Sequence, residues 1–433
     1  MMFSILAIIL LLVLIFLQVP ISFSLFIVGF AGIWYLKGFD VANSVIHLSP
    51  LSGVLSNDVA ALPLFILIGA FALSAGIAKD GYDVARRWLG KLPGGLGVTT
   101  IAAGSVFAAC SGSSTAGAIT MGKLAIPEMR KNGYSDTLSF GACGAGGLLA
   151  SMIPPSGMMV LYGLATGESI SKLLIGGIVP GIILVVAFTL GIIVIAKVKP
   201  SVAPLVNETY TWKEKFSVLP KTWGVIAIFG TIFFGMFTGF FTATEAAAWG
   251  AFISLILLVI RTGKGFFKKF VSACVESASI TVSLLFLVLG AYVFSKLLIF
   301  SGLPLLISNT VSNLDLPPFL ILLGILATYY VLGMFLDGVT MLLITIPIYY
   351  PIITQLGYDG IWFGVIVVGM IEVGMVSPPF GLVVYSLKSI APDVNLFRIF
   401  KGCMIFMVIQ LVVIILLLIF PEMVMWLPDF MSH

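Results

Sequence analysis

The chain has 433 residues, of which 60% are hydrophobic and 9% are charged. Soluble globular domains carry charge on about a quarter of their residues, so this composition excludes an ordinary water-soluble fold. The mean hydropathy of +1.19 indicates a protein that crosses the membrane many times. A net charge of +4 is too small to indicate a nucleic-acid partner or a polybasic lipid-binding surface.

Apolar runs between clusters of turn and charged residues predict ten membrane spans. In chain order they cover residues 3–19, 22–36, 59–78, 135–164, 172–196, 222–239, 245–260, 272–297, 358–388 and 400–420. Two further segments, 97–131 and 317–355, exceed the roughly 20 residues of one crossing and are interrupted midway by small or polar residues. We expect both segments to form re-entrant helical hairpins.

The basic residues predict the orientation of these spans. Most of the 22 Lys and Arg residues fall on one side if the spans alternate, and cytoplasmic loops carry such an excess. Both termini are then extracytoplasmic, and Lys37, Lys172 and Lys296 lie on the outer side. The polar stretch 198–221 becomes a cytoplasmic linker with an interfacial helix around residues 212–218.

Motifs for catalysis and cofactor binding are weak. The four cysteines lie in apolar runs without CxxC spacing, which predicts neither disulfides nor a zinc site. A GxxxxGK match at 117–123 is followed by Leu124 instead of Ser or Thr, and no strand precedes it, so we reject a phosphate-binding loop. The two histidines, His47 and His433, lie outside the predicted spans, which disfavours an intramembrane hydrolase. We therefore expect neither an enzyme nor an organic cofactor.

The chain repeats itself at an offset of 224 residues. The matching positions are Pro127 with Pro351, Gly133 and Tyr134 with Gly357 and Tyr358, Pro154 and Pro155 with Pro378 and Pro379, and Gly157 with Gly381. Five predicted crossings separate the two hairpins, and an odd number places the copies in opposite orientations. The predicted fold is thus an all-α polytopic membrane protein with inverted repeats, each with a re-entrant hairpin and a broken transmembrane helix. Inverted repeats are typical of secondary transporters.

Each copy combines a polar hairpin tip with a span that a double proline interrupts. The tips lie at 111–115 and 337–340, and the breaks at 153–157 and 377–381. Proline lacks the N–H that bonds the carbonyl four residues back, so the prolines free the carbonyls of Ala150, Ser151, Gly374 and Met375. Buried in hydrocarbon, such carbonyls need a cation, a water or another helix.

These oxygens have two possible interpretations. Carbonyls and tip hydroxyls suit a hard monovalent cation such as sodium, and the half-helix N-termini after each break suit an anionic substrate. The alternative is a simple kink whose carbonyls are satisfied by nearby serine hydroxyls. The repetition of the pattern favours the first. Asp337 adds an ionisable group at mid-membrane depth, and Glu372 and Glu276 are weaker candidates of the same kind. Glu245 is better explained as a helix start.

With these residues in view, the sequence resembles the large membrane subunit of tripartite ATP-independent periplasmic (TRAP) transporters. The resembling stretches are LPLFILIG at 62–69, SGSS at 111–114, AIPEM at 125–129, IPPS at 153–156, FTATEAAA at 241–248, GMFLD at 333–337 and SPPFG at 377–381. They follow the order of the family along nearly the whole chain. The resemblance implies an elevator-type sodium symporter related to the ion transporter superfamily, in the bacterial inner membrane. It also implies two partners, a small membrane subunit of about four spans and a periplasmic substrate-binding protein.

The resemblance further implies the positions of the sites and domains. The first sodium site is expected at Ser111, Gly112, Ser113, Ala150, Met152 and Pro155, and the second at Asp337, Gly338, Gly374, Val376, Ser377 and Pro379. The substrate cavity is expected at Ser114, Ser156, Gly157, Thr340 and Gly381. The mobile transport domain comprises 97–165 and 317–390, and the scaffold comprises 1–96, 166–316 and 391–433.

Four positions depart from the pattern of the family. Gly338 replaces the proline after Asp337, Ser377 replaces a threonine, Trp362 a histidine and Met370 an asparagine. Serine keeps the hydroxyl, so ion binding is expected to persist. The lost histidine and asparagine leave the substrate open among C4-dicarboxylates, sialic acids and related carboxylates. A second hypothesis also stays open, namely an ion-coupled carboxylate carrier that needs no binding protein.

Overall fold

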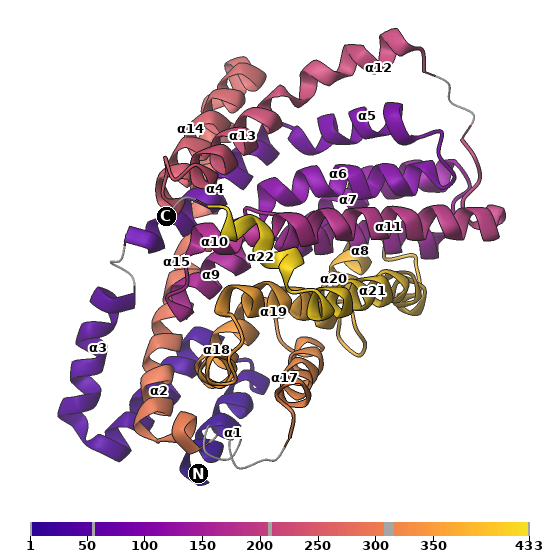
Figure 1. The fold of residues 1–433 in the computed structure, drawn as a ribbon. Helices are drawn as coiled ribbons and strands as arrows, with labels where there is room; N and C mark the ends of the chain where they lie inside the picture. The colour runs from indigo at the N-terminus through magenta and orange to yellow at the C-terminus, as the bar shows by residue number, and fades with distance from the viewer. Residues whose placement is uncertain (1, 54–56, 207–209, 307–315, 432–433) are drawn as a thin grey trace.

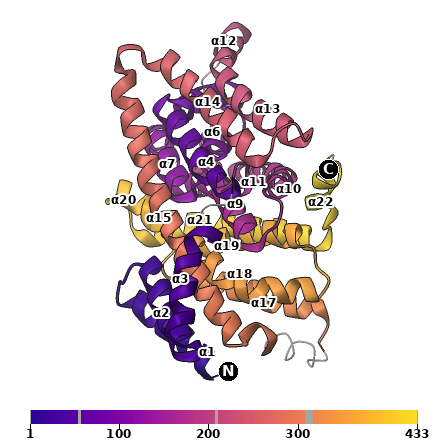
Figure 2. The same ribbon diagram turned by 90° about the vertical axis from the view of Figure 1, so that its left-hand side faces the viewer.

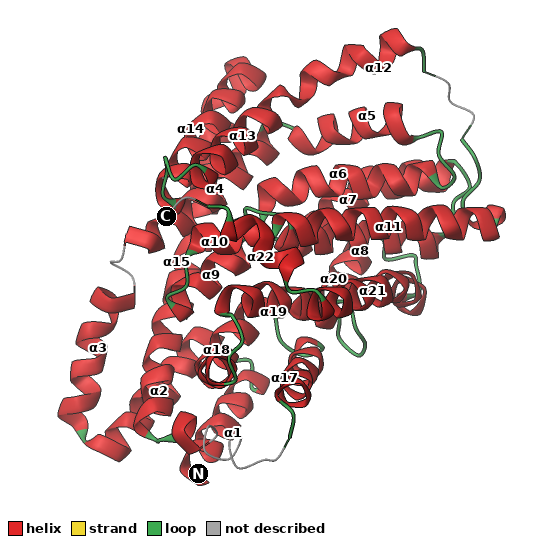
Figure 3. Ribbon diagram, viewed as in Figure 1, coloured by secondary structure: helices red, strands yellow, loops and turns green. Residues whose placement is uncertain are grey.

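The computed structural model describes residues 2–53, 57–206, 210–306 and 316–431, and within these ranges every regular element is a helix (Figures 1 and 3). The helices up to the central linker are α1 (Met2–Phe16), α2 (Ile21–Lys37), α3 (Phe39–Gly53), η1 (Asn57–Ala60), α4 (Ala61–Ser74), α5 (Ile77–Leu89), α6 (Gly95–Ser111), α7 (Ser114–Lys131), α8 (Asp136–Met152), α9 (Gly157–Thr166), α10 (Ile170–Gly176), α11 (Ile178–Val198) and η2 (Pro200–Val202). Those that follow are α12 (Trp212–Val218), η3 (Leu219–Thr222), α13 (Trp223–Phe237), α14 (Ala243–Thr262), η4 (Gly263–Gly265), α15 (Phe266–Phe300), α17 (Pro318–Gly333), α18 (Gly338–Gln355), α19 (Gly360–Met375), α20 (Leu382–Ile390), α21 (Leu396–Ile419) and α22 (Glu422–Asp429).

Both predicted hairpins and both predicted breaks are present. α6 and α7 form the first hairpin, and α17 and α18 form the second. Adding 224 to the bounds of α7 (114–131) gives 338–355, which are the bounds of α18. The same shift takes the first residue of α8 to that of α19 (136 + 224 = 360). The fold is therefore the expected one, an all-α membrane protein built from inverted repeats.

Equivalent side chains start the equivalent helices. Ser135 caps α8 by accepting a hydrogen bond from the N–H of Leu138 at 3.3 Å. Asp359, its equivalent in the second copy, caps α19 by accepting from the N–H of Trp362 at 2.9 Å. Such caps satisfy N–H groups that have no partner within the helix. Elsewhere, Thr242 and Glu245 form a capping box at the start of α14, which confirms the interpretation of Glu245 as a helix start.

Two features of the N-terminal third were not predicted. The predicted span 59–78 is wrong in its last residues, because α4 ends at Ser74 and the polar helix α5 leaves it at 63°. Helix α3 was missed because Asp40, Asn43 and His47 interrupt its apolar residues. A helix is present at 212–218, as predicted, and is labelled α12, whereas residues 207–209 of the linker lie outside the described residues.

By length and composition, six described helical stretches are able to cross a membrane, or up to seven if the bent pair α4 and α5 counts as one span. Several other predicted spans and hairpin arms are shorter apolar helices, among them Ile21–Lys37 and Gly360–Met375. Helix α15 is the longest single element, with 35 residues. It begins beside α14 and ends beside α2 (Figure 2).

Glycines let the helices of the first copy pack backbone to backbone. A Cβ on Gly104 of α6 would lie 2.7 Å from Cα of Gly146 of α8. A Cβ on Gly141 of α8 would lie 2.6 Å from the carbonyl oxygen of Gly402 of α21. No side chain fits at such distances, so α6, α8 and α21 are held in close contact by small residues.

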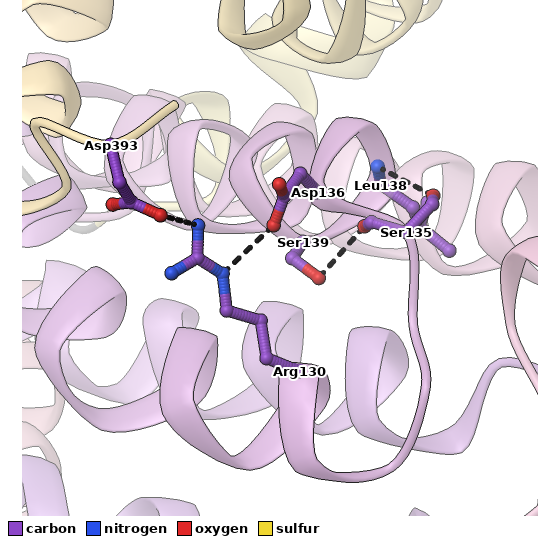
Figure 4. Close-up of polar contacts among 6 residues, drawn as sticks. All are labelled: Arg130, Ser135, Asp136, Leu138, Ser139 and Asp393. Carbon is purple, nitrogen blue, oxygen red and sulfur yellow. Dashed lines mark hydrogen bonds and ion pairs between the residues drawn. The ribbon is translucent and has the colours of Figure 1, made fainter. Parts of the chain in front are cut away.

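A charged cluster joins the end of the first hairpin to the second copy (Figure 4). Arg130 of α7 donates to Asp136 of α8 at 2.8 Å and to Asp393, which lies between α20 and α21, at 2.9 Å. Replacing Arg130 by glutamine is expected to destabilise the protein by roughly 1 kcal/mol, because both ion pairs are partly solvent-exposed. Thermal unfolding in detergent measures this loss, which should shrink at high salt.

The neighbouring Lys131 is exposed and provides the matched control. Lys131→Gln removes the same charge from the same helix turn without removing the two ion pairs. Equal losses of stability for the two variants would show that the Arg130 cluster contributes nothing specific.

Candidate ion and substrate site

A cavity of about 310 Å³ lies where the two hairpin tips meet. Its polar wall comes from the first tip (residues 111–115), from Ser151, Pro155 and Gly157 around the first break, from Asp337 and Gly338 of the second tip, and from Glu372 of α19. Apolar residues of α4, α9 and α15 complete the lining, including Phe65, Leu161 and Leu284. Residues from both copies thus converge on one space, as the repeat pattern predicts.

The first tip lies directly against the first break. Ser113 caps α7 by accepting from the N–H of Ala116 at 3.4 Å. Gly112 adopts φ +58°, which favours glycine, and a Cβ there would lie 3.2 Å from the backbone nitrogen of Gly157. The hydroxyl of Ser111 is buried and has no hydrogen-bond partner among the described residues. A buried hydroxyl without a partner is rare and fits an oxygen that serves a bound ion.

The second tip is built in the same way but carries a charge. Asp337 occupies the position equivalent to Ser113 (113 + 224 = 337) and caps α18 by accepting from the N–H of Thr340 at 3.1 Å. The hydroxyl of Thr340 also donates to this carboxylate. A Cβ on Gly338 would contact the side chain of Met158 in α9, so the second tip reaches into the first copy.

The second break differs from the first. Pro154 and Pro155 are buried, whereas Pro378, Pro379 and Phe380 are exposed. The Pro154–Pro155 and Pro378–Pro379 peptide bonds are both cis.

Two carbonyl predictions need correction. The carbonyl of Gly374 is not free, because it accepts from the N–H of Ser377 at 2.9 Å and from the N–H of Val376. The carbonyl oxygen of Met152 lies 2.8 Å from the position of a Cβ on Gly177. It is therefore packed against the α10–α11 junction and does not face the hairpin tip. The packing of neighbouring helices determines where the carbonyls of Met152 and Gly374 point. The spacing of the prolines does not reveal this packing.

The predicted site residues fall into two groups. Those that line the cavity are Ser111, Gly112, Ser113, Ser114, Pro155, Gly157, Asp337 and Gly338. Those outside its lining are Ala150, Met152, Ser156, Thr340, Gly374, Val376, Ser377, Pro379 and Gly381. Ser156 instead caps α9, and the hydroxyl of Ser377 donates to the carbonyl of Val373 at 2.7 Å. The structure therefore brings the first predicted set together more fully than the second.

Glu372 links the two copies at the cavity wall. Its Oε1 accepts a hydrogen bond from Ser114 of the first tip at 2.6 Å and another from Ser151 of the first broken helix. The residue is 1% exposed, and Oε2 has no partner among the described residues. The sequence marked Glu372 only as an ionisable group in a span, because its partners lie 258 and 221 positions away.

Other expected positions lie elsewhere. Glu276 is exposed on α15 and does not line the cavity. Trp362, the residue in place of the histidine of the family, is buried and donates through Nε1 to the carbonyl of Leu417 at 3.2 Å. Neither Trp362 nor Met370 lines the cavity. These two departures from the family pattern therefore do not change the wall of the candidate site.

The chemistry of this wall favours cations. Asp337 and Glu372 are acidic, the other polar groups are hydroxyls and backbone atoms, and the described lining contains no Lys, Arg or His. Oxygen donors without nitrogen or sulfur ligands suit hard cations. Among the described residues, no cluster of His, Cys, Asp and Glu forms a transition-metal site.

A structural comparison supports the fold. The YdaH transporter from Alcanivorax borkumensis superposes with a TM-score of 0.61 over 88% of each chain, at 12% identity. At this identity the likeness concerns the fold alone.

Sequence comparisons show the family. The C4-dicarboxylate TRAP transporter large permease DctM of Pseudomonas aeruginosa is 32% identical over 372 residues, or 86% of each chain. The sialic acid TRAP transporter large permease SiaM of Vibrio cholerae is 27% identical over 416 residues, or 96% of each chain. These relatives are permeases, which confirms that the chain is not an enzyme. The family model of the DctM component of the tripartite ATP-independent periplasmic transporters matches residues 8–423, and the chain belongs to this family.

Proposed function

We propose that this TRAP permease takes up an organic acid together with sodium ions. The observation that carries the proposal is the charge of the central cavity, which is lined by Asp337 and Glu372 and by no described basic residue. A carboxylate that enters this cavity meets like charges in a medium of low dielectric constant, which is costly. Bound cations remove that cost, so coupling to sodium explains how an acidic cavity accepts an anion.

The first sodium site is proposed at the first tip and the first break. Ser111, Gly112, Ser113 and Pro155 all line the cavity, and the unpartnered hydroxyl of Ser111 supplies an oxygen. The proposed second site is smaller than the sequence indicated. Asp337 and Gly338 line the cavity, whereas their expected partners around the second break lie outside it. The charge of Asp337 compensates for the smaller number of oxygens.

The substrate is proposed to be a carboxylate held near Ser114 and Gly157. Relatives are named for C4-dicarboxylates, sialic acid and 2,3-diketo-L-gulonate, all of which are organic acids. Helix α9 begins at Gly157 in the cavity wall. The N–H groups at the start of this helix suit a carboxylate.

Transport is proposed to follow an elevator-type movement, in which the hairpins and broken helices slide as one body. The packing supports a larger body than 97–165 and 317–390. α21 contacts α8 through Gly141 and Gly402, and α11 packs against α6 at Gly97 and Ile192. We therefore place α11 and α21 in the moving body and leave α1 to α3 and α13 to α15 in the scaffold.

TRAP systems comprise a small membrane subunit and a periplasmic binding protein beside the large permease. We propose that this chain works with both in the bacterial inner membrane, with its termini on the periplasmic side. The rival hypothesis, a carrier that needs no binding protein, predicts sodium-driven uptake by the purified chain alone in proteoliposomes. Uptake that requires all three components rules out that rival.

Ser111→Ala is expected to raise the sodium concentration for half-maximal uptake by roughly tenfold, the effect of losing one good oxygen ligand. The substitution breaks no hydrogen bond among the described residues, so the fold should be unaffected. Uptake by the complete system at varied sodium concentration measures the change.

Ser105 lies on the same helix and is the matched control. Its hydroxyl donates within α6 to the carbonyl of Ala102 at 2.8 Å, and it does not line the cavity. Ser105→Ala should leave sodium activation unchanged. Unchanged activation in Ser111→Ala as well would remove the first sodium site from the proposal.

A further inference from the structure

A second cavity, of about 280 Å³, lies between α9, α15 and α18. Among the described residues that line it, Lys296 carries the only charge, and Tyr292 and Ser295 are the other side chains with a polar group. Nζ of Lys296 lies 5.3 Å from the centre of the Tyr292 ring. No described carboxylate lies within ion-pair distance of this lysine. The cavity therefore presents a partly buried ammonium group that has no anionic partner among the described residues.

The second cavity adjoins the central one. Leu161 of α9 lines both cavities, so the two cavities are neighbours at this side chain. On α18, Val339 lines the central cavity, and Leu343 and Pro347 line the second. These positions are four residues apart and lie on one face of the helix.

Helix α15 continues the same arrangement on the opposite wall. Ile280 and Leu284 line the central cavity, and Val288, Tyr292 and Lys296 line the second. Each step of four keeps neighbouring positions close to one another on the helix surface. Figure 2 shows α15 passing alongside α9 and α18, so three helix faces run from the central cavity to Lys296. This arrangement is a path with acidic groups at one end and a basic group at the other.

We propose that Lys296 forms a binding site for the carboxylate of the substrate, at the outer end of a path that leads to the central cavity. The inference rests on the proposed function, because it assumes that the substrate is an organic anion. An ammonium group beside a hydroxyl and an aromatic ring suits a small carboxylate, since it offers a charge, a hydrogen bond and an apolar surface. The anion binds Lys296 before sodium neutralises the acidic cavity beyond Leu161.

Lys296 lies four residues before the end of α15, and its Nζ also contacts the Tyr292 ring of the same helix. Stability alone therefore does not reveal its role, and the test measures ligand binding. The purified chain, reconstituted in lipid nanodiscs, is treated with an amine-acetylating reagent, and the modification of each lysine is followed by mass spectrometry. The probes are succinate and N-acetylneuraminate at constant ionic strength, and succinamide is the uncharged control.

At least one of the two acids is expected to slow acetylation of Lys296 several-fold, and succinamide is expected to have no effect. Lys37 and Lys172, which line neither cavity, should react at the same rate throughout. Protection by neither acid, or equal protection by succinamide, overturns the proposal. This experiment requires no transport, so it gives a result even if sodium-coupled uptake is not observed.

Uptake by the complete system provides the second measurement. Lys296→Gln should raise the KM for the transported acid roughly fivefold, as expected for a partly exposed ion pair, and leave sodium activation unchanged. Lys296→Arg should restore most of the affinity, and Lys37→Gln should have no effect. An unchanged KM in Lys296→Gln contradicts the carboxylate site. The sodium activation of Ser111→Ala tests the proposed function separately.

Discussion

Replacing Glu372 by alanine is expected to reduce substrate uptake by about a hundredfold, because two hydrogen bonds to a buried charged group contribute roughly 3 kcal/mol. The carboxylate of Glu372 holds Ser114 of the first tip and Ser151 of the first broken helix to α19 of the second copy. Without this carboxylate, the hydroxyls of Ser114 and Ser151 keep only their contact with each other. The first tip then loses its hydrogen bond to α19 of the second copy. Initial rates of uptake by the complete system measure the effect.

A second substitution separates the charge of Glu372 from its shape. Glu372→Gln keeps an oxygen that accepts from both serines, so its unfolding temperature should stay close to that of the wild type. Its uptake should be reduced because the cavity loses one of its two acidic groups. Glu276→Ala is the control, since Glu276 is a membrane-segment glutamate exposed on α15. Wild-type uptake by Glu372→Ala would show that the connection across the copies is dispensable.

Gly374→Val is expected to destabilise the protein by about 2–3 kcal/mol, the cost of overpacking at a tight helix contact. A Cβ on Gly374 of α19 would lie 2.6 Å from Cα of Gly333, the last residue of α17. Neither backbone can move without separating the second hairpin from the second broken helix. Thermal unfolding of the purified chain in detergent measures the loss, and uptake should fall with it.

Gly324 provides a control in the same hairpin. It lies in α17, is exposed, and has no atom within 4 Å of the position of a Cβ. Gly324→Val changes the helix propensity in the same way as Gly374→Val but meets no neighbour. Similar losses of stability in the two variants would contradict the close packing of α17 and α19.

Much of the architecture follows from local sequence features. The double prolines and their offset of 224 residues predict two hairpins and two broken helices, and capping residues such as Ser135 and Asp359 mark where these helices begin. The signal is strong because proline and the caps act on the backbone within one helix turn. It fails at α3, where polar residues interrupt the apolar pattern, and at the bend between α4 and α5.

The candidate site is predicted less completely because it depends on contacts between distant segments. The tips follow from composition, and most of their residues line the cavity. The pairing of Glu372 with Ser114 and Ser151 leaves no trace in the local sequence. The same holds for the carbonyls of Met152 and Gly374, whose surroundings are decided by helices that pack at Gly177 and Gly333.

The replacement of Ser113 in one copy by Asp337 in the other breaks the pseudo-symmetry of the molecule in charge while the backbone keeps it. In a transporter built from inverted repeats, exchanging the conformations of the copies interconverts its outward-facing and inward-facing states. If the copies had identical sequences, these two states would be related by a two-fold rotation and would have equal energies. Acidic groups in one copy alone, Asp337 and also Glu372, whose equivalent is Leu148, make them unequal, and the membrane potential acts on a displaced elementary charge with about 2.3 kcal/mol per 100 mV. We therefore expect the two unmatched acidic residues to contribute to the preference of the carrier for one side of the membrane.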